Sequence, residues 1–352
     1  MLNSLVLAGI FIVVVVVFCV SENYPPRHMR IGAQNRHDYM NAMHVQTSSK
    51  SISNTSNSRV YTTILKGVAI ILVLICHFSG NMSRVFTPLG GIGVAMFLVL
   101  SGYGLNESYK KNGLQNFWSK RFIRLWIPYA IVICALTLIE KHPLIWLFNN
   151  ITLYQCPFWF IKYIILWYLL FWVVSQFVPR YRRQIIIFLG FGLLFVTSGV
   201  RGEQALSFPL GLLLSEMKMR LEFNKLNIPR VFLLGLLIIG IAFLSLKQTH
   251  WYRAIESDVL INLLNLPIKL GLGLFLIFAI SKISCLYNNK FLMFTGLISY
   301  ELYMVHYPFR GLAGVNLALA ILVIIVSYLI SYILYRLDNP LSSCVGRFFN
   351  RS

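Results

Sequence analysis

The sequence predicts an all-α fold, a polytopic bundle of transmembrane helices, on three observations. Of the 352 residues, 57% are hydrophobic and only 12% are charged, about half the usual share of charged residues in soluble proteins. The apolar residues gather in separate runs of about 17 to 22 residues, long enough to cross a ~30 Å hydrocarbon core as helices. Because these runs exceed the length of a barrel strand, a helical bundle is favoured over a β-barrel.

Eleven spans are expected, one for each apolar run. They lie near residues 3–20, 61–79, 88–105, 125–140, 158–178, 184–200, 204–215, 230–246, 259–281, 291–309 and 314–335. The run at 204–215 is the shortest. A polar stretch separates the first run from the other ten, so the expected architecture is a ten-span core with one extra N-terminal span.

Four regions follow from these spans. Residues 1–20 lack a basic start and a small-residue cleavage site, so we expect a retained helix with its N-terminus outside. Residues 21–58 are expected to form a cytosolic, disordered linker, because "TSSKSISNTSNS" is polar and of low complexity. The ten-span membrane domain occupies 59–340, and residues 341–352 form a cytosolic tail.

The net charge of +20 indicates topology rather than a nucleic-acid partner. The basic residues lie between apolar runs and are not interleaved with stacking aromatics in one polar domain. Most of the 31 lysines and arginines fall in alternate connections, which the positive-inside rule places in the cytosol. The opposite connections hold Arg84, Lys141, Arg201, Lys247, Arg253 and Arg310. Three further lysines, Lys66, Lys162 and Lys269, lie within spans.

The six cysteines are scattered along the chain. Under the expected topology only Cys156 lies on the outer side. This distribution predicts neither a disulfide framework nor a metal site.

The first core span, "ILKGVAIILVLICHFSG", carries a lysine and a histidine in an otherwise apolar segment. On a helix Lys66 and His77 point within about 20° of each other and lie roughly 16 Å apart along the axis. A charged residue near the bilayer centre costs on the order of 3 kcal/mol, so the shared face is expected to line a cavity. Taken singly, Lys66 could instead snorkel to the headgroups and His77 could make an ordinary polar contact.

The next span contains "GGIGVAMFLVLSGYGL". Its glycines lack phosphate-loop spacing, so Gly90, Gly91 and Gly93 predict close helix packing. Ser101, Gly102 and Tyr103 follow near the cytosolic end, where Tyr103 could also be an interfacial aromatic.

Basic residues precede the following span in "FWSKRFIRLWIPY". Lys120 and Arg124 share one helix face, and Arg121 lies beside Arg124. Basic residues with flanking aromatics at this position are ordinary topogenic and headgroup anchors.

The later spans hold few polar groups. In "ISYELYMVHYPF" Glu301 is the only acid well inside an expected span, and His306 lies towards its outer end. One alternative is a buried Lys–Glu pair, since an intramembrane charge usually finds a partner. The other is that Glu301 orients a histidine or binds sugar hydroxyls. Aromatics on the outer side could stack on sugars but are more often interface residues, so they assign no acceptor.

These four pieces occur in the order and approximate spacing of the acyltransferase-3 family of membrane O-acyltransferases, which the chain resembles from about residue 61 to 336. The resemblance implies a multi-pass enzyme of the bacterial inner membrane. It implies transfer of an acyl group, usually acetyl, from cytosolic acyl-CoA to a hydroxyl of a cell-surface or periplasmic glycan, with no bound cofactor or metal. Its partners would be acyl-CoA, the glycan acceptor, membrane lipids and possible glycan-assembly proteins.

The resemblance also assigns roles. The family's basic residue, ten intervening positions and histidine fall on Lys66 and His77, although the family usually has arginine where this chain has Lys66. By resemblance Ser101, Gly102 and Tyr103 line the donor entrance, and Arg121 and Arg124 bind the phosphates of coenzyme A. Lys162, Glu301 and His306 are the candidates for acceptor binding or for support of the histidine.

Two mechanisms and two other functions stay open. His77 could take the proton of an acceptor hydroxyl, a contribution of roughly 10² to 10⁴ in rate, or carry the acyl group covalently. Intramembrane charges also suit a transporter for a polysaccharide or its lipid-linked precursor, or a component of a glycan-export complex. The ordered set of motifs favours the enzyme.

Overall fold

The computed structural model describes residues 39–79, 84–217, 219, 221–222, 226, 228–313 and 317–349. The expected N-terminal span at 1–20 lies outside these residues. All regular elements of the described part are helical. The α-helices are α2 (Tyr39–Ser79), α3 (Thr87–Asn112), α4 (Phe117–Arg121), α5 (Ile127–Ile139), α6 (Leu144–Ile151), α7 (Trp159–Phe177), α8 (Arg182–Val196), α9 (Gly199–Gly202), α10 (Ser207–Glu216), α11 (Arg230–Leu246), α12 (His250–Arg253), α13 (Asp258–Leu266), α14 (Leu272–Ile280), α15 (Lys290–Leu297), α16 (Ser299–Ala313) and α17 (Leu317–Phe349).

Two π-helical segments each join two consecutive α-helices into one longer helix. Segment η3 (Phe122–Trp126) joins α4 to α5, and η5 (Pro267–Gly271) joins α13 to α14. Three-residue and five-residue 3₁₀ turns occupy Arg84–Phe86, Pro179–Tyr181 and Ser284–Asn288.

Six helices are long and apolar enough to cross a membrane, which makes the chain a multi-pass membrane protein. They are Ser58–Ser79, Thr87–Asn112, Phe117–Ile139, Trp159–Phe177, Asp258–Ile280 and Ala318–Leu337. Each overlaps an expected span. The expected spans near 184–200, 204–215, 230–246 and 291–309 contain the shorter helices α8, α10, α11, α15 and α16, and the full count of ten stays a prediction.

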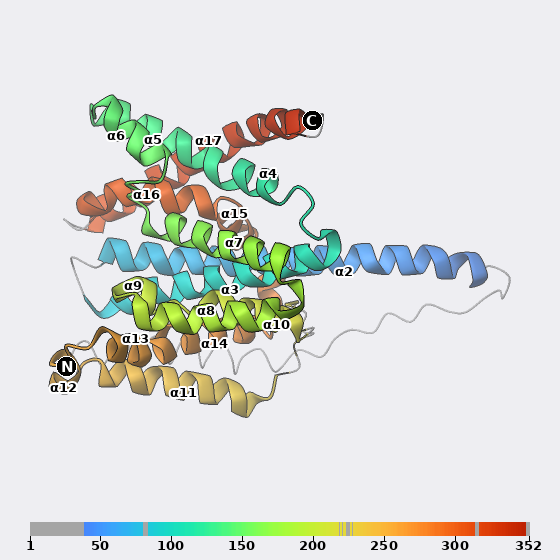
Figure 1. The fold of residues 1–352 in the computed structure, drawn as a ribbon, viewed down its shortest axis with the longest axis horizontal. Coiled ribbons are helices and arrows are strands. Elements are labelled where there is room, and N and C mark those ends of the chain that lie inside the picture. The colour runs from blue at the N-terminus through green and yellow to red at the C-terminus, as the bar shows by residue number, and fades with distance from the viewer. Residues whose placement is uncertain are drawn as a thin grey trace.

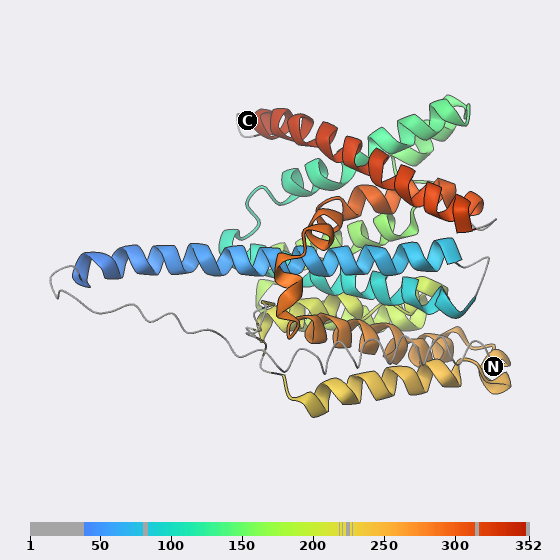
Figure 2. The same ribbon diagram turned by 180° about the vertical axis from the view of Figure 1, so that it is seen from behind.

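Helices α2 and α17 extend into the expected linker and tail. Helix α2 begins at Tyr39, so residues 39–58 are helical rather than disordered. No glycine or proline interrupts the chain from Tyr39 to Lys66, and a nucleated helix adds each further residue at little cost. Helix α17 also runs on through residues 341–349, although it contains Pro340 and Gly346. In Figures 1 and 2 α2 projects beyond the other helices on one side of the bundle.

Helix α3 lies between α2 and α10 and contacts both extensively (Figure 1). Glycines permit this close approach. A Cβ on Gly93 would meet the Ala69 carbonyl oxygen of α2, and one on Gly102 would meet the Phe208 carbonyl oxygen of α10. The sequence predicted close packing at the first of these positions.

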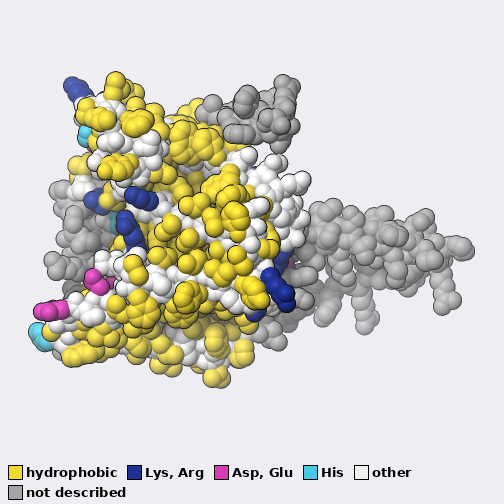
Figure 3. Space-filling view, viewed as in Figure 1, with side chains coloured by type: hydrophobic (Ala, Val, Ile, Leu, Met, Phe, Trp, Pro, Cys, Tyr) yellow, Lys and Arg dark blue, Asp and Glu magenta, His cyan; other side chains and the backbone are white. Residues whose placement is uncertain are grey.

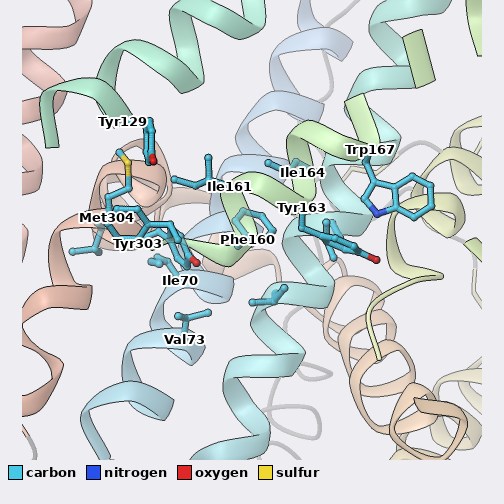
Figure 4. Close-up of a cluster of buried hydrophobic side chains, with 14 of the residues drawn as sticks. Ile70, Val73, Tyr129, Phe160, Ile161, Tyr163, Ile164, Trp167, Tyr303 and Met304 are labelled. Atoms are coloured by element: carbon cyan, nitrogen blue, oxygen red, sulfur yellow. The ribbon is translucent and has the colours of Figure 1, made fainter. Parts of the chain in front are cut away.

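The main core lies between α2, α3, α5, α7 and α16, where aromatic and branched side chains interlock (Figure 4). Trp167 and Tyr129 are fully buried there. The outside of the bundle is apolar too: Figure 3 shows hydrophobic side chains over most of one face, with charged groups towards its two ends. Val231 is 81% exposed. A broad apolar surface of this kind suits lipid rather than water.

Candidate functional site

The last turn of α2 and the middle of α16 bring two histidines together. His77 Nδ1 lies 2.7 Å from His306 Nε2, and His306 Nδ1 lies 2.7 Å from the carbonyl oxygen of Leu302. The two rings meet edge to edge, with their centroids 5.0 Å apart and 22° between their planes. His306 is fully buried, whereas His77 is partly exposed. Only one member of the pair therefore faces open space.

These contacts fix the protons of the neutral pair. A carbonyl oxygen can only accept, so His306 Nδ1 carries a hydrogen and donates it to Leu302. His306 Nε2 must then accept, and His77 Nδ1–H donates to it. The other ring nitrogen of His77, Nε2, is left with a lone pair. That arrangement is the one required of a base or a nucleophile.

Aromatic side chains hold the two rings in place. The Phe78 ring meets His306 edge-on at 5.8 Å, and Tyr307 meets His77 edge-on at 6.2 Å. Phe158 packs against Tyr307 at 5.6 Å. The buried side of the pair is thus enclosed by aromatic rings.

His77 lines a cavity of about 670 Å³ near the C-terminal end of α2. This volume lies in the range of pockets that bind drug-sized ligands, about 300 to 1,000 Å³. Its aromatic lining consists of Trp159, Tyr252 and Tyr303, and its charged lining of Glu203, Lys247, Arg253 and Lys269. Under the expected topology the cavity is on the outer side of the membrane.

One wall of the cavity rests on a buried ion pair. Lys269 from η5 pairs with Glu203, and each side chain is 10% exposed. The other carboxylate oxygen of Glu203 accepts from Asn265 Nδ2 at 2.8 Å. The pair lies against α3, where a Cβ on Gly91 would come within 2.6 Å of Lys269 Cε. Gln204 Nε2 donates to the Gly91 carbonyl oxygen at 2.7 Å.

Asn265 extends this network towards the rim. Its Oδ1 accepts from Lys247 Nζ at 2.8 Å, and its Nδ2 donates to the Tyr252 hydroxyl oxygen at 2.5 Å. Burial lowers the pKa of Lys247 and raises that of Tyr252. The wall is therefore a connected set of hydrogen bonds whose acceptors are largely occupied.

The structure separates the three residues expected to support the histidine or the acceptor. His306 contacts His77, as described above. Glu301 is buried at 5% exposure, but Lys269 pairs with Glu203 rather than with Glu301. Lys162 is exposed, with its Nζ 3.5 Å from the Tyr154 carbonyl oxygen, and it lines a second cavity rather than that of His77.

Three of the five residues expected at the donor side, Ser101, Arg121 and Arg124, lie around a tyrosine that was not predicted from the sequence, Tyr168 of α7. Its hydroxyl lies near the Ser101 side chain, and the Arg121 guanidinium carbon lies 5.9 Å from the centre of its ring. The charge of Arg124 acts on both Tyr168 and Lys66. Arg121 also lies 4.0 Å over the Phe117 ring. Lys66, Ser101, Arg121, Arg124 and Tyr168 are called the basic cluster below.

The basic cluster has more cations than partners. Within the described part of the chain, Lys66 and Arg124 form no ion pair and no side-chain hydrogen bond. Arg121 donates only to the Phe117 carbonyl oxygen, at 2.9 Å. Three cations without a carboxylate leave a place for an anionic ligand.

Gly102 and Tyr103 lie on another side of α3. Gly102 packs against the backbone of α10, and the Tyr103 hydroxyl accepts from the Leu221 amide at 3.3 Å. Successive residues on a helix point 100° apart, so only Ser101 of this triplet faces the basic cluster.

Metal ligation has no support among the residues that the structure describes. No three His, Cys, Asp or Glu side chains there lie close enough together to hold an ion. The four cysteines whose side chains are described, Cys76, Cys134, Cys156 and Cys285, are free thiols.

Comparison with known proteins finds a family. The model of a family described as an acyltransferase domain matches residues 59–336, well over half of the chain. Neither the curated proteins nor the solved structures provide a match. The matched region contains both histidines, the outer cavity and the whole basic cluster.

Proposed function

The chain belongs to the acyltransferase-3 family, and we propose that it is an O-acyltransferase of the bacterial inner membrane that modifies a cell-surface or periplasmic glycan. The donor would be cytosolic acyl-CoA, most often acetyl-CoA. The observation that carries the proposal is the hydrogen-bonded chain from Leu302 through His306 to His77, which ends in an imidazole lone pair at a cavity wall.

In the direct mechanism His77 acts as a general base. His77 Nε2 takes the proton of the acceptor hydroxyl while the hydroxyl oxygen attacks the thioester carbonyl carbon. The carbon–sulfur bond then breaks, and the coenzyme A thiolate takes up the proton from His77. The two imidazoles would share the transient positive charge through the His77–His306 hydrogen bond.

In the second mechanism His77 is the nucleophile. Its Nε2 attacks the thioester carbon, the carbon–sulfur bond breaks, and coenzyme A leaves as the thiolate. The acceptor oxygen then attacks the acyl carbon, the carbon–nitrogen bond breaks, and the hydroxyl proton passes to Nε2 and from there to solvent, which protonates the thiolate. The same tautomer serves both routes, because each needs the Nε2 lone pair. A covalent intermediate would allow the donor to leave before the acceptor enters.

The basic cluster suits the other end of the donor. Lys66 and His77 share α2 and lie roughly 16 Å apart along its axis. Phosphates bound by Lys66, Arg121 and Arg124 would leave the extended pantetheine arm of coenzyme A to carry the thioester along α2 towards His77. Such an arrangement would transfer an acyl group across the membrane without moving the donor through it.

The test is mass spectrometry of the surface glycans of the native host with and without the gene. Loss of one acyl mass per repeat on deletion, restored by the wild-type gene but not by His77→Ala, would support the proposal and name the acyl group. Loss of the whole glycan from the surface, with its acylation intact inside the cell, would favour a transporter or an export component. Membrane levels of each variant supply the control.

A further inference from the structure

The charged lining of the outer cavity has not yet been given a ligand. Among the described residues that line it, the cations are Lys247, Arg253 and Lys269, and the only acid is Glu203. Arg310 lies 4.0 Å over the Tyr307 ring, and its charge acts on His77. The exposed acids Glu256 and Asp258 lie in the adjoining segment but do not line the cavity. The cavity is therefore positively charged overall.

The acid in the cavity is already neutralised. One oxygen of Glu203 pairs with Lys269, and the other accepts from Asn265. Both oxygens thus have strong donors, and a ligand gains little by approaching either. Lys269 is matched in the same way, which leaves Lys247 and Arg253 as the cations without a carboxylate partner in the described part of the chain.

The hydrogen bonds at the rim leave donors rather than acceptors. Lys247 donates one of its three ammonium hydrogens to Asn265 Oδ1, so two hydrogens remain available to a ligand. The Tyr252 oxygen accepts from Asn265, so its own hydrogen is available. Lys247 also lies 5.7 Å from the centre of the Tyr252 ring, which places the two donors side by side. Arg253 is exposed and adds a planar set of donors.

A neutral sugar both donates and accepts through its hydroxyls, so it is poorly matched to a wall that mostly donates. A carboxylate or phosphate only accepts, and it gains the charge of two cations as well. Burial has already removed part of the water from Lys247, so an anion there would meet a less hydrated ammonium.

We propose that the outer cavity binds an acceptor through an anionic group, a carboxylate or a phosphate, held by Lys247, Arg253 and Tyr252 while a neighbouring hydroxyl faces His77. This inference rests on the proposed function, because it takes the ligand of this cavity to be the acyl acceptor. It narrows the acceptor to acidic or phosphorylated glycans.

The test measures equilibrium binding to the full-length chain in nanodiscs of phosphatidylcholine, whose headgroup carries no net charge. Four probes form two matched pairs: tetragalacturonate with a neutral galactose tetrasaccharide, and glucose 6-phosphate with glucose. We expect one anionic probe to bind at least tenfold more tightly than its neutral partner, a difference of about 1.4 kcal/mol. The pair that shows it identifies carboxylate or phosphate.

The variant Lys247→Gln with Arg253→Gln should abolish that preference and leave the neutral probes unchanged. Lys141→Gln is the matched control, because Lys141 is an exposed cation on the same side and lies outside the cavity. If neither anionic probe is preferred tenfold, or if the preference persists in the double variant, the inference is wrong.

Binding is measured without acyl-CoA, so this result is independent of catalysis. If the protein discriminates between the probes but acylates no glycan, the anion site in the cavity is supported and the proposed function is wrong. If it acylates a glycan but does not discriminate between the probes, the proposed function is supported and the anion site is wrong.

Discussion

The outer cavity lies near His77 and the basic cluster near Lys66, on one face of α2. The two regions differ in how many of their charged side chains have partners within the protein. At the cavity, Lys269 and Glu203 neutralise each other, and Asn265 connects the pair to Lys247. At the basic cluster, Lys66 and Arg124 have no counterion among the described residues. The wall of the cavity is preorganised by its own hydrogen bonds, and only Lys247 and Arg253 lack a carboxylate partner there, whereas none of the cations of the basic cluster has one.

This difference separates the roles of the two ends. The tautomer and the orientation of a catalytic base must be fixed before the substrate arrives, because misplacement by about 1 Å can lower the rate 10²-fold. A phosphate site can be left electrostatically incomplete, since the ligand brings the missing charge. Mutations at the cavity should therefore reduce kcat, and mutations at the basic cluster should reduce donor affinity.

The contrast between the two regions requires the outer cavity and the basic cluster to face opposite sides of the membrane. In a chain freed of its native cysteines, we expect a single cysteine at position 50 to resist an impermeant reagent outside intact cells. A cysteine in the loop of residues 149–157 should react. The result should be all or none, because the bilayer excludes a charged reagent. Labelling of position 50 from outside would overturn the assigned sides.

The largest catalytic loss is expected from His77→Ala. Removal of the imidazole deletes either the base or the nucleophile, and base catalysis alone is worth roughly 10² to 10⁴ in rate. The measurement is kcat for acyl transfer by the purified protein, with acyl-CoA affinity as the internal control. His77→Gln keeps most of the side-chain volume and should fail equally. Near-normal turnover in either variant at equal expression would contradict the assignment.

His306 is expected to act through His77, as a positioning residue. His306→Ala removes the acceptor that fixes the His77 tautomer, so kcat should fall by up to roughly 100-fold. The KM for acyl-CoA should change little.

A partial rescue distinguishes positioning from simple packing. The side-chain oxygen of His306→Gln can still accept from His77 Nδ1–H, so its kcat should exceed that of His306→Ala. Equal turnover in the two variants, or a loss confined to KM, would show that His306 only fills space.

The basic cluster should respond in binding. Arg121→Gln with Arg124→Gln should weaken acyl-CoA binding at least about tenfold, or 1.4 kcal/mol, and reduce its salt dependence. Arg180→Gln is the matched control, because Arg180 is an exposed cation expected on the cytosolic side but outside the cluster. Unchanged affinity in a folded double variant would leave the two arginines as membrane anchors.

The sequence predicted the parts of this molecule that depend on local pattern. The six long apolar helices and the close packing at Gly93 follow from composition and residue size. Their physical causes lie within one or two helices, and so the sequence of those helices sufficed. The helical start of α2 was missed because its composition is polar, although nothing in it stops a helix.

The pairings across the bundle could not be predicted in the same way. His77 and His306 are 229 positions apart, and their contact depends on how α2 and α16 pack. Glu203 falls in an expected connection, so its burial with Lys269 had no signal in hydropathy. Tyr168 was one of many apolar-span aromatics, and only the fold shows that Ser101 and Arg121 meet around it.

Lys66 provides the smallest and most discriminating of these effects. If the basic cluster needs only a fixed positive charge, Lys66→Arg should keep acyl-CoA affinity within about threefold, because guanidinium also binds phosphate and the cluster lacks a carboxylate that would constrain it. Lys66→Ala should weaken binding further than Lys66→Arg, and raised salt should narrow the gap between them. A lysine that merely snorkels would tolerate alanine, because it contacts no ligand. Acyl-CoA titrations of the three proteins decide between these outcomes, and equal affinity for wild type and Lys66→Ala would remove Lys66 from the donor site.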